Sequence, residues 1–70
     1  MTREQRQADR LERFEQMLAG LRGQYDSLTA QMAGLKAQGK TRTATYRQLM
    51  AQRLTVSQML ECCRVYGLLD

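Results

Sequence analysis

Hydrophobic residues recur along the first half of the chain at intervals that alternate between three and four. This alternation returns every side chain to one narrow stripe of an α-helix, which is the a/d pattern of a heptad repeat. Eight consecutive matches predict one long helix that packs against another helix. This heptad stripe comprises Leu11, Phe14, Leu18, Leu21, Tyr25, Leu28, Met32 and Leu35.

Signals for the two ends of this helix flank the heptad stripe. Thr2 and Gln5 have the S/T-x-x-E/Q spacing of a capping box, in which each side chain bonds the backbone N–H of the other residue. At the far end, Lys36 suits the last turn, and Gly39 can adopt the left-handed conformation that closes a helix. These signals predict a first helix over about residues 3–38.

A second helix is predicted after a short polar segment. Thr45 and Gln48 form another capping box, and Gly67 stands where a helix closes, with Leu68 able to fold back over the last turn. The second helix is therefore expected over about residues 46–66. Its core face comprises Tyr46, Leu49, Val56, Leu60 and Cys63, widened by Met50, Met59 and Tyr66.

Two helices joined by a short loop, residues 39–45, predict an all-α fold in the form of an antiparallel two-helix hairpin. The helices differ in length, roughly 54 Å against 32 Å at ~1.5 Å per residue, so the second covers the first only back to about Leu18. Leu11, Phe14 and Met17 then project beyond the hairpin with nothing to touch. We therefore expect a homodimer of hairpins, a four-helix bundle or coiled-coil assembly. Its interface joins the heptad stripe to Val56, Met59, Leu60, Cys63 and Tyr66.

Length and composition are those of one small domain, residues 1–70. Apolar residues make up 43% of the chain, and proline, tryptophan and histidine are absent. No apolar run is long enough for a transmembrane span or the core of a signal peptide, so no membrane association is expected. With only two cysteines and no export signal, we expect a cytoplasmic, reducing setting.

The net charge of +4 is unevenly distributed along the chain. Residues 27–60 carry five basic side chains and no carboxylate, whereas residues 1–26 balance five arginines against five acids. Such a charge either keeps a loop solvated or contacts phosphates, so the alternative function is a small nucleic-acid-binding regulator that uses the basic segment 36–53. Its candidate contact residues are Lys36, Lys40, Arg42, Tyr46, Arg47 and Arg53.

A stretch of about twenty residues that begins at Tyr46 resembles the helix-turn-helix of bacterial regulators. Two positions depart from that motif: Thr55 replaces the turn glycine, and Glu61 occupies a position that should be buried and aliphatic. Burying Glu61 is costly, and one continuous helix avoids that cost, so the continuous helix is the favoured interpretation. The matching positions, for the small residue, the core leucine and the start of the recognition helix, are Ala51, Leu54, Val56 and Ser57.

No arrangement of residues in the chain suits catalysis. Without histidine, and without a nucleophile beside a base, the needs of acid–base and covalent catalysis go unmet. Cys62 and Cys63 point about 100° apart on a helix, and two thiolates without histidine or a CxxC spacing make a poor metal site. We therefore expect no enzyme activity, no cofactor and no metal. The favoured interpretation is a small helical oligomerisation or protein-interaction module, whose stripe alternatively receives a helix from a different protein.

Overall fold

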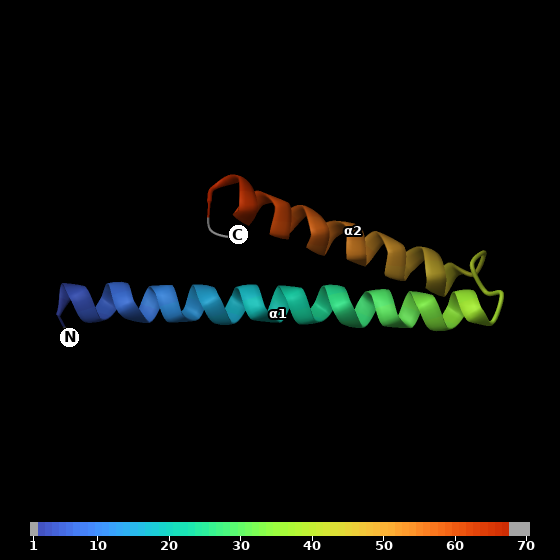
Figure 1. Cartoon of the computed structure of the whole chain (residues 1–70), viewed down its shortest axis with the longest axis horizontal. Coiled ribbons are helices and arrows are strands. Elements are labelled where there is room, and N and C mark those ends of the chain that lie inside the picture. Colours follow the sequence, from blue (N-terminus) through green and yellow to red (C-terminus); the bar gives the residue numbers. More distant parts are fainter. Residues whose placement is uncertain (1, 68–70) are drawn as a thin grey trace.

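The computed structural model describes residues 2–67, which form two helices and no strand. Helix α1 spans Arg3–Ala37 and helix α2 spans Ala44–Val65. α2 runs back along the C-terminal part of α1, and the N-terminal part of α1 extends beyond the end of α2 (Figure 1). The predicted all-α helical hairpin is thereby confirmed. The molecule is a rod with extents of 55 × 22 × 18 Å.

The start of α1 is a reciprocal cap between two side chains. The Gln5 backbone N–H donates to Thr2 Oγ1 (N···O 3.2 Å), and the Thr2 backbone N–H donates to Gln5 Oε1 (3.0 Å). Glu4 in the first turn also favours the positive end of the helix dipole. The capping box predicted from the sequence is confirmed, and it satisfies two backbone donors that the helix itself leaves unpaired.

The end of α1 is a Schellman motif built on a glycine. Gly39 has φ +72°, a left-handed conformation that glycine adopts without steric cost. The Lys40 N–H donates to the Leu35 carbonyl (2.8 Å), and the Gly39 N–H donates to the Lys36 carbonyl (3.0 Å). These two bonds satisfy carbonyls that have no partner within the helix, so the predicted role of Gly39 is confirmed. The helix itself ends at Ala37.

The start of α2 differs from the sequence prediction. Thr43 caps the helix: its Oγ1 accepts from the Tyr46 N–H (3.2 Å) and donates to the Lys40 carbonyl (2.9 Å). The predicted cap at Thr45 is wrong, because the turn at Gly39 brings Thr43 within reach of both the loop and the helix. Thr45 instead lies in the first turn, since the helix begins at Ala44, two residues earlier than expected.

α2 is one continuous helix that also closes on a glycine. Gly67 has φ +72°, and its N–H donates to the Arg64 carbonyl (2.9 Å). The predicted contact of Leu68 with the last turn lies outside the described residues. Because α2 is unbroken from Ala44 to Val65, the two-helix arrangement implied by the helix-turn-helix resemblance does not occur there. Glu61 is exposed on this helix, as the continuous-helix interpretation required.

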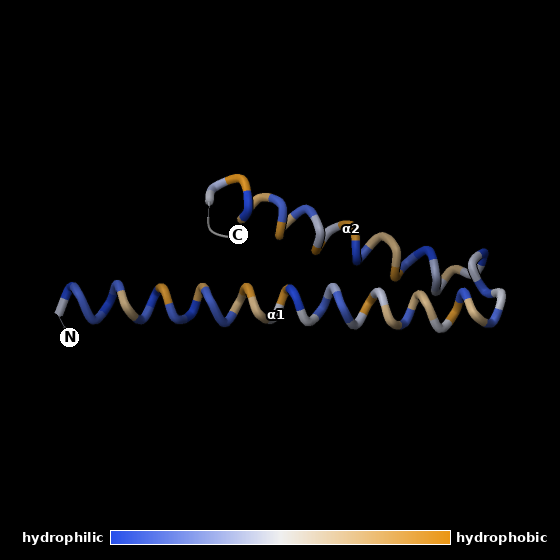
Figure 2. Tube along the Cα trace, in the orientation of Figure 1, coloured by the Kyte–Doolittle hydropathy of each residue, from blue (hydrophilic) through white to orange (hydrophobic). Residues whose placement is uncertain are grey.

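The core lies between the heptad stripe of α1 and one face of α2. Four residues of the described chain are buried, and three others pack, partly buried, against the cluster formed by Leu21, Leu28 and Val56. Hydrophobic positions continue along α1 into the part that α2 does not reach (Figure 2). The stripe therefore extends further than the core that uses it. The buried residues are Leu21, Leu28, Met32 and Val56, and the packed neighbours are Tyr25, Leu49 and Leu60.

Candidate interaction surface

The predicted interface residues fall into three groups according to how much of them the hairpin covers. Leu21, Leu28, Met32 and Val56 are buried within the single chain, whereas Leu11, Met59 and Tyr66 are exposed, Leu11 to 58% and Tyr66 to 77%. The remaining residues are half-buried, and no described side chain is completely removed from solvent. This half-buried group comprises Phe14, Leu18, Tyr25, Leu35, Leu60 and Cys63.

The chain exposes more surface than a compact protein of its mass. Its accessible surface is 5791 Å² for 8.1 kDa, whereas folded monomers of that mass expose about 4,500 Å². Its radius of gyration is 16.3 Å, against about 11 Å for a compact domain of this length. Two helices side by side bury only one face of each, which accounts for both departures.

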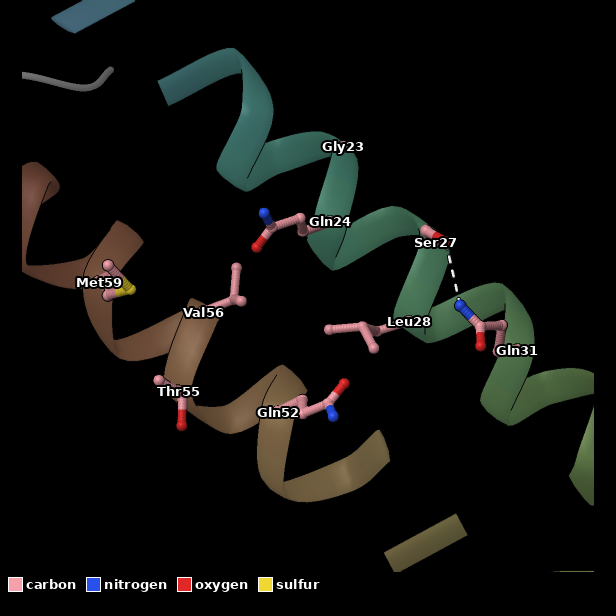
Figure 3. Close-up of a pocket in the computed structure, with 9 residues that line it drawn as sticks. All are labelled: Gly23, Gln24, Ser27, Leu28, Gln31, Gln52, Thr55, Val56 and Met59. Carbon is pink, nitrogen blue, oxygen red and sulfur yellow. Dashed lines mark hydrogen bonds between the residues drawn. The ribbon is translucent and has the colours of Figure 1, made fainter. Parts of the chain in front are cut away.

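One side of the hairpin carries an open groove of about 660 Å³ between the two helices (Figure 3). The side chains of Leu28 and Val56 point into the space between the helices (Figure 3). On the α1 side, the Gln31 amide donates to Ser27 Oγ (3.1 Å), so this polar rim is already partly paired. A smaller groove of about 280 Å³ shares Gln31 and continues toward the loop beside Leu35 and Leu49. The residues that line the larger groove are Gly23, Gln24, Ser27, Leu28, Gln31, Gln52, Thr55, Val56 and Met59.

Within residues 2–67, the glycines inside α1 have open space where a side chain would begin. A Cβ atom added at Gly20, Gly23 or Gly34 would meet no atom within 4 Å. Each glycine lowers the stability of a helix interior by about 1 kcal/mol relative to alanine. No close packing within the described hairpin offsets that cost. Gly23 and Gly34 line the two grooves, so within residues 2–67 no side chain packs closely against the glycines on this side.

Arg53 occupies a core-facing position of α2 that the sequence interpretation assigned only to the basic surface. The half-buried or buried positions of α2 recur at intervals of three and four through Leu49, Arg53 and Val56. The Arg53 guanidinium lies 5.9 Å from the centre of the Tyr25 ring, and its Nη1 donates a long bond to Thr29 Oγ1 (3.5 Å). The interval of four residues from Leu49 and three to Val56 could have predicted that Arg53 faces the core. A charged side chain is not expected at such a position, so the sequence interpretation missed it.

The side of the hairpin that carries Arg53 forms a small concavity of about 230 Å³. Lys36 and Thr29 line it from α1, and Tyr46 and Arg53 line it from α2. Of the other predicted contact residues, Lys40, Arg42 and Arg47 are exposed on the loop and the start of α2. The structure therefore brings Lys36, Tyr46 and Arg53 together and places the other three toward the hairpin tip.

Carboxylates take part in one ion pair within residues 2–67, between Glu61 and Arg64 on the exposed face of α2. The hydrogen bond from Arg64 lowers the pKa of Glu61 below its ordinary value, and the same contact raises the pKa of Arg64. Cys62 is exposed and Cys63 is half-buried, and both are free thiols. No group of three or more metal-ligating side chains occurs in the described part of the chain.

Neither helix, over the residues described, is long and apolar enough to cross a membrane. No protein-family model, curated protein or solved structure matches this chain.

Proposed function

We propose that this chain is a non-enzymatic, self-associating helical module, in which two hairpins form a four-helix bundle. The observation that carries the proposal is the continuation of the heptad stripe beyond the reach of α2. Leu11 is 58% exposed and Phe14 only half-buried in the single chain, although both occupy core positions of the repeat. An apolar stripe of this kind stabilises the protein only when another helix covers it and removes its surface from water.

The area available supports the same proposal. The chain exposes about 1,300 Å² more than a compact monomer of its mass, and a stable interface takes about 800 Å² from each partner. A second copy on the free part of the stripe and the edges of the hairpin would therefore remove more than half of this excess from each chain. Exposed Met59, Tyr66 and Met17 lie among the surfaces that it would cover.

Charges on the free part of α1 are also suited to a second copy. Most charges of this segment are separated by sign around the helix: the spacings place Arg3, Arg6 and Arg10 on one side and three glutamates on another, while Asp9 lies close to the arginines. Arg3, Arg6 and Arg10 line one side together. Within residues 2–67, none of these charges has an ion-pair partner. The acidic side comprises Glu4, Glu12 and Glu15. If the two α1 helices of a dimer run parallel, Arg10 of one copy lies beside Glu15 of the other, which is an attractive pair.

The proposal includes a cytoplasmic setting, in which Cys62 and Cys63 remain reduced. Sedimentation equilibrium of the full chain at micromolar concentration tests it. We expect twice the 8.1 kDa mass of the chain and a melting temperature that rises with concentration. A species of 8.1 kDa that melts cooperatively, at a temperature independent of concentration, would refute self-association.

A further inference from the structure

We propose that the loop-proximal half of the hairpin binds the phosphate backbone of a nucleic acid, with the concavity between Lys36, Tyr46 and Arg53 as its centre. This function goes beyond self-association and does not depend on it, because every residue involved comes from one chain. The ligand is defined by its chemistry, a polymer of phosphodiesters contacted without regard to base sequence.

The first support is the separation of charge that folding produces. The acid-free stretch, residues 27–60, includes the C-terminal part of α1, the loop and most of α2. Because the chain turns back at residues 38–43, the two halves of this stretch lie side by side (Figure 1). Its five cations therefore share one half of the rod, without a carboxylate among them. The carboxylates of residues 2–67 all lie outside the stretch: Glu4, Asp9, Glu12, Glu15, Asp26 and Glu61.

The second support is the concavity itself. At about 230 Å³ it has room for a phosphate group and part of its hydration. An arginine fork offers five N–H donors in a geometry that matches phosphate oxygens, and Arg53 uses one of them in a long bond to Thr29. The Tyr25 ring lies beside the guanidinium and helps to hold it in place, which lowers the entropy cost of binding. Lys36 and the Tyr46 phenol complete the lining with further donors.

The third support is the surface around the concavity, which indicates a polymer and not a single phosphate. Lys40, Arg42 and Arg47 are exposed on the loop and the first turn of α2, so three further cations lie at the end of the hairpin where Lys36 and Tyr46 line the concavity. The loop, residues 38–43, contains no apolar side chain that could enter a lipid surface, whereas membrane-binding segments present such residues. Nucleic acid is therefore favoured over an anionic membrane.

Fluorescence anisotropy with labelled 20-nucleotide DNA and RNA, single-stranded and duplex, tests the proposal. If four of the five cations in residues 27–60 each contact a phosphate, the affinity for nucleic acid should fall roughly 100-fold between 50 and 200 mM salt. The variant Lys36→Gln/Arg47→Gln removes two exposed cations from the basic half. We expect it to bind at least 10-fold more weakly at 50 mM salt, with a salt slope about 2 units shallower.

The matched control is Arg13→Gln/Arg22→Gln, which removes the same charge from residues 1–26. We expect its affinity to change less than about 3-fold, because these arginines lie outside the acid-free stretch. Circular dichroism must give the parent's helicity for both variants, and all four positions are exposed, so the fold should persist. Arg53→Lys keeps the charge but removes the fork, and it should weaken binding several-fold.

Several outcomes would overturn the proposal. They are a failure to bind any oligonucleotide at 50 mM salt, an equal loss in the two double variants, and affinity that does not depend on salt. Binding to vesicles containing 30% phosphatidylserine with none to oligonucleotides would assign the surface to membranes instead. Competition by inorganic phosphate at millimolar concentration as effective as that of oligonucleotide phosphate would reduce the site to a simple anion site. None of these results depends on the mass measured by sedimentation, so failure of this proposal is distinguishable from failure of self-association.

Discussion

Leu11 and Leu54 form a matched pair for measuring what the free part of the heptad stripe contributes. They are the same residue type and are exposed to 58% and 59% in the single hairpin. Leu11 lies on the stripe of α1, whereas Leu54 lies outside the core-facing positions of α2. In an isolated hairpin, truncating either one to alanine removes mostly solvated surface, so the two variants should be equally stable.

If the chain self-associates through the stripe, the two variants should differ in their dissociation constants. The size of that difference follows from the exposed area of Leu11. Covering the exposed part of Leu11 removes roughly 100 Å² from water, worth about 2.5 kcal/mol at ~25 cal/mol/Å². Truncation to alanine forfeits about two-thirds of that in each copy, so a symmetric dimer loses about 3 kcal/mol. The dissociation constant of Leu11→Ala should therefore rise roughly 100-fold. Leu54→Ala should leave it within about 3-fold of the parent value.

The assay is sedimentation equilibrium across a concentration series, with melting followed by circular dichroism on the same samples. Both variants should retain the helicity of the parent, since alanine favours helices at least as well as leucine. Equal dissociation constants for the two variants would contradict the assignment of Leu11 to the interface. A larger effect of Leu54→Ala would place the second copy on the opposite side of α2.

Three further changes test local features of the hairpin. Gly23→Ala should raise the free energy of unfolding by about 1 kcal/mol in urea titrations, because its Cβ meets no atom within 4 Å; a loss of stability would instead reveal a partner on the groove side. Thr43→Ala should lower the free energy of unfolding by about 1 kcal/mol while Thr45→Ala changes it by less than ~0.5, and equal effects would contradict the observed cap. Because Arg64 lowers the pKa of Glu61, their pair stabilises the folded chain above the ordinary pKa of 4.5 and loses that effect as the pH falls through the lower folded value. The difference in melting temperature between the parent and Glu61→Gln should accordingly shrink from pH 7 to pH 3, and a constant difference would argue against the pair.

Features that depend on neighbours in sequence were predictable. A heptad spacing fixes which side chains share a helix face, whatever that face meets, so the stripe from Leu11 to Leu35 identified both α1 and its packing side. The cap at Thr2 and the closing glycine at Gly39 depend only on residues within one or two turns. The cap of α2 was missed because Thr43 and Thr45 are chemically equivalent candidates. The bond from Thr43 to the Lys40 carbonyl arises only once the turn has formed.

By itself the sequence determined that the chain makes two helices, which faces are apolar, and that one segment of 34 residues, 27–60, is free of acids. These are periodic or additive properties, which do not require knowing what lies across space. The tertiary structure alone decided that Arg53 packs beside Tyr25, that Lys36 and Tyr46 join it around one concavity, and that the glycines of α1 face open space. Such contacts depend on the rotation and separation of two helices. Those quantities are set by how all the side chains between the helices pack together, and no single spacing encodes them.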